Sequence, residues 1–351
     1  MGNATTMTIG IDLGDLRSEV CMLDGEGVVS RRFNAATTRA GLEKRLGGLA
    51  PARVVIEVGT HSPWVSRWLE AQGHEVIVAN ARAVRSIAES DAKTDRSDAE
   101  QLARLGRVDP KLLRPIRHRG EAAQRHRMRI AVRDHLVRTR ASFVVQARGL
   151  AKGLGERLPG CKADAFVRRM REKGLADLFP GMSEILALVE HLDAQIAALD
   201  RELDAISRTH YPETRLLRQV PGVGTLTALT YVLTVEDPQR FRSSRVVGAY
   251  LGLRTRLRQS GSRNPQLRIT KAGDGTLRRL LVQCAHALIH RGPDSDLQRF
   301  GRRLAARGGR AARKKSVVAV ARKLAVLLHR LWITGEVYEP LHRAESTAAA
   351  A

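Results

Sequence analysis

The sequence predicts an α/β domain with a mixed sheet, a helical middle region and a mostly α-helical, basic C-terminal domain. Three observations lead to this prediction. Short strand-like segments open the chain and then alternate with helical segments. A heptad pattern follows in the middle of the chain, and the remainder is helix-rich, basic and interrupted by glycine. At 351 residues, the chain is long enough for two or three domains with their own cores.

Residues 1–112 are predicted to form the α/β domain. Turn residues separate three short strand-like segments, and the run "ARVVIEVG" is continuously apolar, as expected for a buried strand. Gly73 ends the helix that follows this run. The predicted elements are strands at 6–14, 18–27, 28–35, 52–59 and 74–80, and helices at 41–49, 63–73 and 95–106.

A proline-containing basic segment interrupts this alternation and leads into the helical middle region, 113–212. Residues 121–150 are predicted to form a basic helix. Further on, apolar residues recur at alternating steps of four and three, which predicts a coiled-coil seam. The seam residues are Ile185, Val189, Leu192, Ile196, Leu199, Leu203 and Ile206. The pattern fits a helix packed within its own domain, an antiparallel hairpin with the basic helix, or a contact between subunits.

The C-terminal domain is placed at 213–340 and begins near the motif "VPGVGTLTAL". Pro-Gly-x-Gly between two helices lets backbone N–H groups approach a phosphate, as in a helix-hairpin-helix turn. Gly222 and Gly224 are therefore candidates for nucleic-acid contact, although Pro-Gly turns also join ordinary helices. Residues 341–351 are predicted to be a disordered tail.

The charge of the chain indicates a polyanionic partner. Lys and Arg total 60 against 36 Asp and Glu, a formal net charge of +24. Neutralising phosphates and releasing counterions drives nucleic-acid binding, so DNA or RNA is the expected ligand. A basic soluble factor associated with ribosomes is the alternative, and nothing resembles a basic membrane-surface helix with an aromatic face. Aromatic residues make up only 4%, which argues against stacking surfaces for single strands.

The cysteine pattern and the hydropathy predict a cytoplasmic protein. Cys21, Cys161 and Cys284 are far apart and form no Cys-x-x-Cys pair, so neither a disulfide framework nor a zinc site follows. The first residues show no signal peptide, and no stretch reaches the ~18 apolar residues of a membrane span.

Four carboxylates in the first domain stand where catalytic metal ligands would stand. Asp12 and Glu57 end two predicted strands, and Asp95 and Asp98 lie three residues apart on one helical face. Four convergent carboxylates would repel one another unless cations lay between them. Two Mg²⁺ ions ~4 Å apart, or Mn²⁺ in their place, would remove that repulsion and could activate a nucleophile against a phosphodiester. Any one of these residues taken alone could equally be a solvent-exposed surface acid, and Asp95 could also be the N-cap of a helix.

A serine-glycine-serine turn, Ser260 to Ser262, lies in a strongly basic segment of the C-terminal domain. Arginine forks match phosphate oxygens and stabilise charge developing at phosphorus. No histidine is near in sequence to act as a base, so the local pattern favours a phosphate-binding loop over a nucleophile. Candidate nucleic-acid contacts are Arg254, Arg256, Arg258, Arg263, Arg268 and Lys271, with Arg125, Arg129 and Arg133 of the basic helix. The basic run 302–325 fits a solvated or nucleic-acid-binding helical face.

Taken in order, Asp12, Glu57, "KTDRSDAEQLA", "VPGVG" and "SGSRNPQLRITKAG" resemble the DEDD transposases of bacterial insertion sequences, the one-hundred-and-ten family. The resemblance covers nearly the whole chain. It implies an RNase H-like, RuvC-like N-terminal domain with Asp12, Glu57, Asp95 and Asp98 as the metal-binding tetrad. It also implies a coiled coil for subunit contacts and a C-terminal transposase domain whose serine, matched by Ser260, attacks DNA and forms a covalent intermediate.

The same resemblance implies partners and a reaction. The protein would excise and insert its own insertion sequence by Mg²⁺-dependent cleavage and strand exchange. Its partners would be the element ends and target DNA, a structured non-coding bridge RNA that pairs with both, and further copies of the chain as a homo-oligomer, a dimer of dimers. The metal cluster of one domain would activate a serine delivered by the other, and Ser262 is the alternative nucleophile.

Two other functions fit part of the pattern. A structure-selective nuclease of the RuvC type would use the four carboxylates and water, and would leave Ser260 as a phosphate contact. A non-enzymatic nucleic-acid scaffold would need only the positive charge. The nuclease would produce free 5′-phosphate ends without a protein–DNA adduct, and the scaffold would not depend on the acidic residues.

Overall fold

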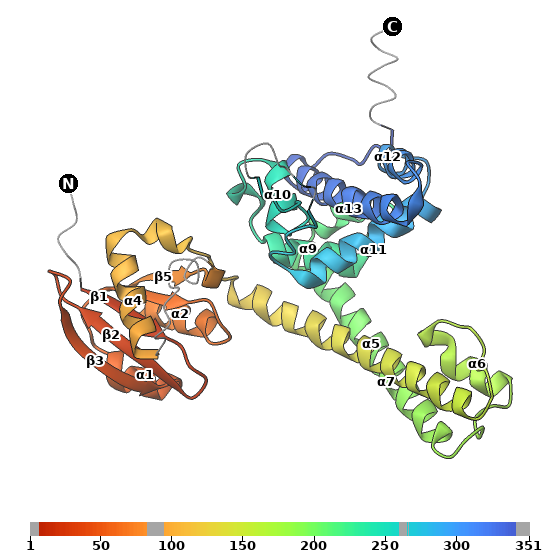
Figure 1. The fold of residues 1–351 in the computed structure, drawn as a ribbon, viewed down its shortest axis with the longest axis horizontal. Coiled ribbons are helices and arrows are strands. Elements are labelled where there is room, and N and C mark those ends of the chain that lie inside the picture. Colours follow the sequence, from red (N-terminus) through yellow and green to blue (C-terminus); the bar gives the residue numbers. More distant parts are fainter. Residues whose placement is uncertain (1–6, 83–94, 260–264, 266, 342–351) are drawn as a thin grey trace, which may run out of the picture. The chain divides into compact units, whose positions relative to one another are not determined.

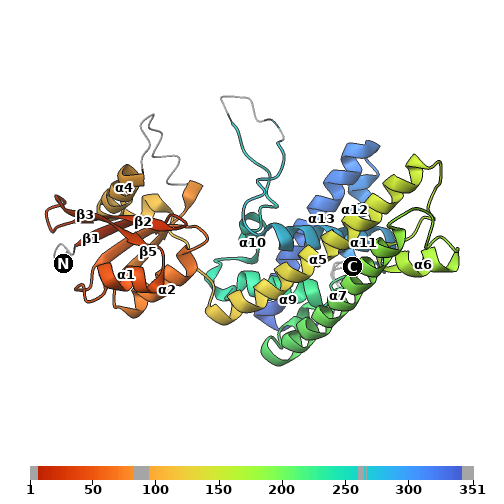
Figure 2. The same cartoon turned by 90° about the horizontal axis from the view of Figure 1, so that it is seen from below.

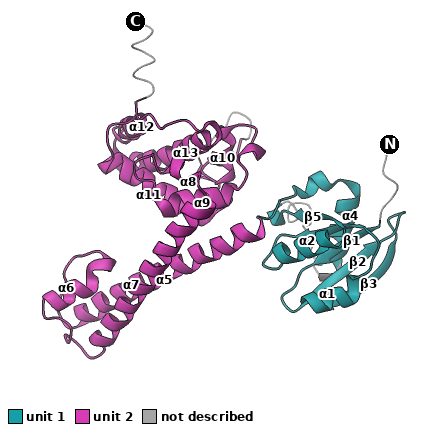
Figure 3. Ribbon diagram, turned by 180° about the vertical axis from the view of Figure 1, so that it is seen from behind, with its two compact units in different colours: residues 1–119 teal, residues 120–351 magenta. Residues whose placement is uncertain are grey.

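The computed structural model describes residues 7–82, 95–259, 265 and 267–341, with backbone only for Asp95 and Arg96. The chain divides into two compact units, residues 1–119 and residues 120–351 (Figure 3). We refer to them as unit 1 and unit 2 and describe each by itself. No described helix combines the length and the apolar character needed to span a bilayer. The tail predicted at 341–351 lies outside the described residues from position 342 onward.

Unit 1 is the mixed α/β domain that the sequence predicts (Figure 1). Its sheet has the strand order β3-β2-β1-β4-β5. Strands β1, β2 and β3 are antiparallel neighbours, whereas β4 runs parallel to β1 and to β5. The elements are β1 (Thr8–Asp12), β2 (Arg17–Leu23), β3 (Val29–Ala36), α1 (Arg39–Leu46), β4 (Arg53–Glu57), α2 (Ser62–Ala71), β5 (Glu75–Ala79), α4 (Asp95–Val108) and the 3-10 turn η1 (Pro110–Leu113).

Both faces of the sheet are covered, so the strands alternate between two cores. Ile9 and Ile56 pack with buried residues of α1 and α2 on one face. Val55 and Ile77 pack against Leu102 of α4 on the other face. Because both faces are apolar, the central strand β4 reads as a continuous hydrophobic run, which is why the sequence identified it.

Helix α4 approaches the sheet closely because β1 carries a glycine beneath it. A Cβ at Gly10 would lie 2.0 Å from the carbonyl oxygen of Ala99 and 2.6 Å from the amide nitrogen of Ala103. Both atoms belong to helix backbone, so a side chain at position 10 cannot be accommodated by a rotamer change. Gly10 therefore fixes the depth at which α4 packs on β1.

Gly10→Ala is expected to lower the free energy of unfolding of unit 1 by about 2–3 kcal/mol, because α4 must move away from β1. Urea denaturation followed by circular dichroism would measure this change. Gly59→Ala is the matched control, since a Cβ at Gly59 meets no atom within 4 Å and that residue has no positive φ. Equal stability of the two variants would contradict the close packing of α4 on β1.

Unit 2 is helical, as predicted for the middle and C-terminal parts of the chain. Its elements are α5 (Glu121–Gly153), η2 (Ala163–Ala165), α6 (Phe166–Glu172), α7 (Met182–His210), α8 (Thr214–Leu217), α9 (Thr225–Val235), η3 (Pro238–Arg240), α10 (Ser244–Tyr250), α11 (Gly275–Arg291), α12 (Asp296–Ala305) and α13 (Gly309–Thr334). Helices α9 to α13 surround a single core with Tyr231 at its centre. The buried hydroxyl of Tyr231 donates to the carbonyl of Ala325 (2.7 Å).

The long helices α5 and α7 form an antiparallel hairpin, which we call the stalk (Figure 2). At the distal end, Val144 and Ala147 of α5 pack with Ile185 and Val189 of α7. At the proximal end, Ile130 packs with Leu203. All seven heptad residues predicted from the sequence are buried or partly buried. Of the alternatives that the heptad pattern left open, the structure shows the hairpin.

Candidate functional site

The strands β1 and β4 bring Asp12 and Glu57 to the same edge of the sheet. These strands are parallel neighbours, and Ile11 pairs with Ile56, so that the next residues are Asp12 and Glu57. Neighbouring strands lie about 4.8 Å apart, which sets the spacing of the two backbones. Both side chains are partly exposed. The sheet therefore presents two carboxylates side by side at its carboxyl edge, as predicted.

Helix α4 directs its first turn toward this same edge. Its middle crosses β1 at Gly10, and its end lies at the opposite edge, where Arg107 Nη1 donates to the carbonyl of Asp24 (3.3 Å) in the β2–β3 turn. The helix therefore runs antiparallel to β1, and Asp95 and Asp98 belong to its N-terminal turns. The positions of all four predicted carboxylates converge on one edge, although the side chain of Asp95 is not described.

The described side chains at this edge do not form a ready-made metal cage. Among the residues whose side chains are described, no three His, Cys, Asp or Glu groups lie close enough together to hold an ion. The donor chemistry fits a hard divalent cation nonetheless, because the set is purely carboxylate oxygen, which suits Mg²⁺ and Mn²⁺. A metal would have to draw these side chains together when it binds.

A neighbouring acid on α4, Glu100, has a structural role instead. Its carboxylate accepts from Arg104 Nε (2.8 Å) and pairs with Arg32 of β3. These contacts, that of Arg104 first, lower the pKa of Glu100 and keep its carboxylate charged. Glu100 thereby joins α4 to the edge strand of the sheet.

Two loop residues at the carboxyl edge were not singled out as candidates by the sequence. His61 Nε2 lies 3.4 Å from Asp15 Oδ1, and His61 Nδ1 accepts from Trp64 Nε1 (3.2 Å). Asp15 follows β1 and His61 follows β4, so this pair links the two loops beyond Asp12 and Glu57. The residues are 46 positions apart, and no local pattern in the sequence signals their pairing.

In unit 2, two segments on either side of the predicted serine turn are paired by a short backbone ladder. We call the described residues 254–259 and 267–270 the serine arm. Thr255 forms an antiparallel bridge with Ile269, flanked by hydrogen bonds from Arg256 N to Arg268 O (3.0 Å) and from Thr270 N to Arg254 O (2.9 Å). The exposed arginines at 254, 256 and 268 are thus on one ladder, and the exposed Arg258 follows it. Ser260, Ser262 and Arg263 lie outside the described residues.

The base of the serine arm is fixed by close backbone contacts. Lys271 N donates to Gly252 O (3.1 Å), and a Cβ at Gly252 would lie 2.3 Å from the carbonyl oxygen of Ala272. Gly252 has a φ of +69° and Lys271 a φ of +55°, so both residues adopt the left-handed conformation. The guanidinium of Arg278 donates to the carbonyls of Leu251 and Ala272. The arm therefore leaves the helical core from a rigid base.

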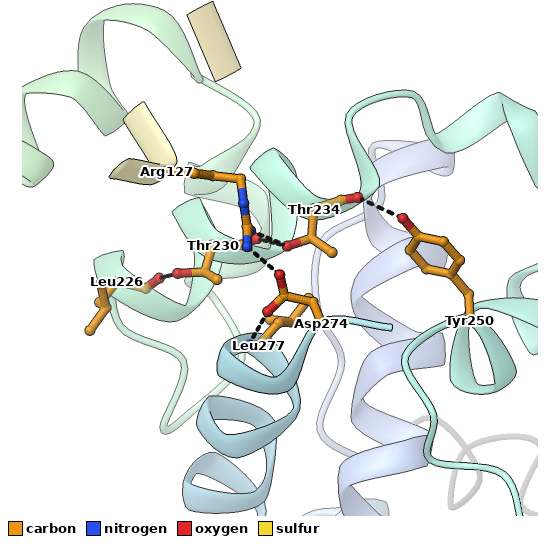
Figure 4. A network of polar contacts seen from close by, with 7 residues as sticks. All are labelled: Arg127, Leu226, Thr230, Thr234, Tyr250, Asp274 and Leu277. Atoms are coloured by element: carbon orange, nitrogen blue, oxygen red, sulfur yellow. Dashed lines mark hydrogen bonds and ion pairs between the residues drawn. The ribbon is translucent and has the colours of Figure 1, made fainter. Parts of the chain in front are cut away.

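A polar network joins this base to the stalk (Figure 4). Asp274 accepts from the amide of Leu277 (2.8 Å) and so caps α11. Its other carboxylate oxygen pairs with Arg127 of α5, and Arg127 Nη1 donates to Thr234 Oγ1 (2.7 Å). Tyr250 donates to the carbonyl of Thr234 (3.3 Å). The network links α5, α9, α10 and α11 at the point where the serine arm returns.

Asp274→Ala is expected to lower the free energy of unfolding of unit 2 by about 3 kcal/mol. The side chains of Asp274 and Arg127 are only 9% and 21% exposed, so the change leaves a largely desolvated guanidinium without its carboxylate and α11 without its cap. Chemical denaturation would measure it. The control is Asp294→Ala, which removes an exposed pair with Arg299 and should cost less than about 1 kcal/mol. Equal losses would refute the special role of Asp274.

The predicted phosphate-binding turn lies between α8 and α9. Gly222 has a φ of +85°, and Gly224 immediately precedes α9. The carboxylate of Asp204 already accepts from Thr225 Oγ1 (3.0 Å) at the start of this helix. That negative charge opposes an anion at the helix N-terminus. Phosphate contact by Gly222 and Gly224 stays a prediction.

The basic residues of the stalk are paired within the molecule. Arg125 pairs with Glu121 one turn earlier, whereas Arg129 and Arg133 pair across the hairpin with carboxylates of α7. Arg133 makes two parallel hydrogen bonds to Asp200, at 2.8 and 3.0 Å. Sequence reasoning missed the partners of Arg129 and Arg133 because they lie more than sixty positions away. Nucleic-acid contact by these arginines stays a prediction.

Comparison with known proteins identifies the class. A family model described as a transposase matches residues 9–155, and the model of the Transposase IS116/IS110/IS902 family matches residues 214–301. These regions contain the carboxylate edge and the serine arm, and they define the chain as a transposase, an enzyme that cleaves and recombines DNA. Transposases of this class imply a divalent metal ion.

Curated relatives agree with this class. The transposase of the insertion sequence element IS1328 from Yersinia enterocolitica is 30% identical, over 81% of this chain and 84% of that protein. The transposase of IS1111A from Coxiella burnetii is 27% identical, over 94% and 90%. The pilin gene-inverting protein of Moraxella bovis is 24% identical, over 77% and 76%. The chain therefore belongs to the IS116/IS110/IS902 family of transposases.

Proposed function

We propose that this transposase excises and inserts its own insertion sequence through a covalent serine–DNA intermediate. In this proposal, Ser260 of unit 2 is the nucleophile, and unit 1 is an RNase H-like domain that holds divalent ions with Asp12, Glu57, Asp95 and Asp98. The observation that carries the proposal is the convergence of the four carboxylate positions on one edge of the sheet. The basic ladder of the serine arm supports it independently.

The proposed step is a transesterification at a phosphodiester. The hydroxyl oxygen of Ser260 bonds to phosphorus, the bond from phosphorus to one nucleotide oxygen breaks, and the serine proton is transferred to a carboxylate acting as base. A nucleotide hydroxyl then attacks the phosphoserine, which releases the serine and restores a phosphodiester. The ester bond is conserved throughout, so that exchange of strands requires no ATP.

The side chains of the chain have separate tasks in this step. The arginines of the serine arm, Arg254, Arg256 and Arg268, would hold the phosphate oxygens and stabilise charge at phosphorus. The tetrad would bind Mg²⁺ or Mn²⁺, which when bound supplies Lewis-acid activation of phosphate and nucleophile oxygens. The short ladder fixes the backbone positions of these arginines, which lowers the entropic cost of bringing them to a phosphate.

The proposal also includes two partners. The net charge of +24 suits a second polyanion besides DNA, and we propose that this is a structured non-coding RNA that selects the sites by base pairing. We further propose that the chain works as a homo-oligomer, a dimer of dimers. Sequence choice would then reside in the RNA, and the protein would supply the chemistry.

The test is a search for protein-linked DNA on a denaturing gel. Purified chain would be incubated with labelled element-end DNA and RNA transcribed from the flank of the element, with Mg²⁺ or with EDTA. An adduct that requires Mg²⁺ supports the serine intermediate. Cleavage to free 5′-phosphate ends without an adduct would identify a hydrolytic nuclease of the RuvC type instead. Binding without cleavage under any condition would leave a nucleic-acid scaffold.

A further inference from the structure

A groove in unit 2 has, apart from Arg268, no residue with a part in the function proposed so far. It lies along α13 and is also lined by α10, α12 and the base of the serine arm. Its volume is about 1650 Å³. A pocket for a drug-sized molecule has about 300–1,000 Å³. We call this feature the α13 groove. Its size suits an extended ligand better than a compact one.

The rim of the α13 groove is strongly basic. Only two carboxylates, Asp296 and Glu339, are among its lining residues. The lining includes exposed cations that form no ion pair with any residue the structure describes: Arg245, Arg268, Lys271, Arg307, Lys314 and Arg322. Like charges so close together repel one another unless an anionic ligand lies between them.

The arginines of the stalk differ from those of the groove because carboxylates of the same chain pair with them. There, Arg129, Arg133 and Arg140 each have a carboxylate of α7 as partner, so their charge stabilises the hairpin. The six groove cations named above have no such partners among the described residues. Compared with the basic side chains of the stalk, those of the groove therefore carry charge that is available to an external polyanion.

The floor of the α13 groove is apolar and indicates which form of polyanion it binds. Leu253, Val318 and Leu327 line it, together with the aromatic rings of Phe300 and Tyr338. Lys323 Nζ lies 4.0 Å from the centroid of the Phe300 ring. A duplex hides its base faces and offers mainly phosphates to a protein. A single strand offers phosphates to the rim and base faces to an apolar, aromatic floor.

We propose that the α13 groove binds a single strand of polynucleotide and leads it to the serine arm. Arg268 and Lys271 belong both to the groove and to the arm or its base, so a strand bound in the groove reaches the basic surface of the serine arm. The place of this site in strand exchange rests on the proposed function, whereas the binding itself does not. Single strands arise whenever strands are exchanged or a guide RNA pairs with DNA.

The test compares two double variants of the same helix that remove equal charge. Lys314→Gln with Arg322→Gln neutralises the groove, and glutamine retains most of the Arg322 stem that lies against Gly248 of α10. Arg310→Gln with Arg313→Gln is the control, because these exposed residues of α13 do not line the groove. Fluorescence anisotropy with a labelled oligo(dT), an oligo(rU) of equal length and a DNA hairpin would measure Kd for the full chain in EDTA, at several salt concentrations.

The groove variant is expected to raise Kd for the single strands at least about tenfold, and the control variant to change it less than about twofold. Two lost phosphate contacts should also reduce the slope of log Kd against log salt by about 1.4, an effect that general misfolding would not produce. Phe300→Leu is expected to raise Kd for the single strands about tenfold with an unchanged salt slope, because it removes a ring face and no charge.

Other results would overturn the proposal. Equal losses in the groove and control variants would show that only the overall charge matters, and an unchanged Kd in the groove variant would show that the groove binds nothing. Loss of hairpin binding alone would assign the groove to duplex DNA. A preference for oligo(rU) or for oligo(dT) supports the proposal and identifies the strand as RNA or DNA. Because EDTA prevents cleavage, this binding is independent of whether the adduct assay succeeds.

Discussion

Replacing Ser260 by alanine is expected to abolish the covalent protein–DNA adduct, lowering its yield by at least about 10,000-fold. Alanine lacks the oxygen that would bond to phosphorus, and removal of a nucleophile costs an enzyme nearly all of its chemical step. Binding of DNA and RNA should change less than about twofold, because the arginines of the serine arm remain. The measurement is the denaturing-gel assay, with anisotropy on the same preparation as the binding readout.

The neighbouring serine provides a matched control for this prediction. Ser262→Ala removes the same kind of hydroxyl two positions further along the chain, and should retain the adduct. An adduct that survives Ser260→Ala and disappears with Ser262→Ala would reassign the nucleophile. An adduct that survives both changes would remove the turn from the chemistry and leave its arginines as phosphate contacts.

The sheet of unit 1 was predictable because its signals are local. Two strands can be recognised from a few residues each: the one that ends at Asp12 and the apolar run that ends at Glu57. The turn residues between them mark where one element ends and the next begins. That two parallel strands place their final residues at one edge follows from sheet geometry alone. The carboxylate edge could therefore be predicted before the structure.

The seam of α7 was predictable in its pattern but not in its partner. A heptad repeat indicates that one face of the helix is buried, but it does not identify the segment that packs against that face. The partner became clear only from the pairing of Arg133 with Asp200 and of Ile130 with Leu203, contacts between segments far apart in sequence. The same basic helix that suggested a nucleic-acid surface is in this way largely committed to the hairpin.

The features that escaped prediction depend on close approach between distant segments. Gly10 looks like any strand glycine until α4 is seen to contact it. The ladder of the serine arm joins Arg254 to Thr270, and neither segment has a regular strand pattern in the sequence. The α13 groove combines residues from five parts of unit 2. Its aromatic lining also qualifies the sequence-based argument from low aromatic content, because a few rings suffice when they gather in one place.

Asp12→Asn is expected to reduce strand cleavage by at least about 1,000-fold while leaving the fold of unit 1 intact. Asparagine has nearly the same shape, so β1 and its pairing with β4 should persist. It has no negative charge, however, and one amide oxygen is a much weaker ligand for Mg²⁺ than a carboxylate. Cleavage of labelled element-end DNA over a range of Mg²⁺ and Mn²⁺ concentrations would measure the loss.

A second readout separates metal binding from catalysis. Ions that bind only the folded chain raise its Tm by an amount that grows with the logarithm of the ratio of ion concentration to Kd, and Asp12→Asn should lose this Mg²⁺-dependent shift. Asp15→Asn is the matched control at the same edge: its carboxylate faces His61 and is 95% exposed, so both the shift and cleavage should stay within about threefold of the wild type. If Asp12→Asn kept the thermal shift and the cleavage rate, the carboxylate edge would not be the metal site. The convergence of the four carboxylate positions would then need a purely structural cause.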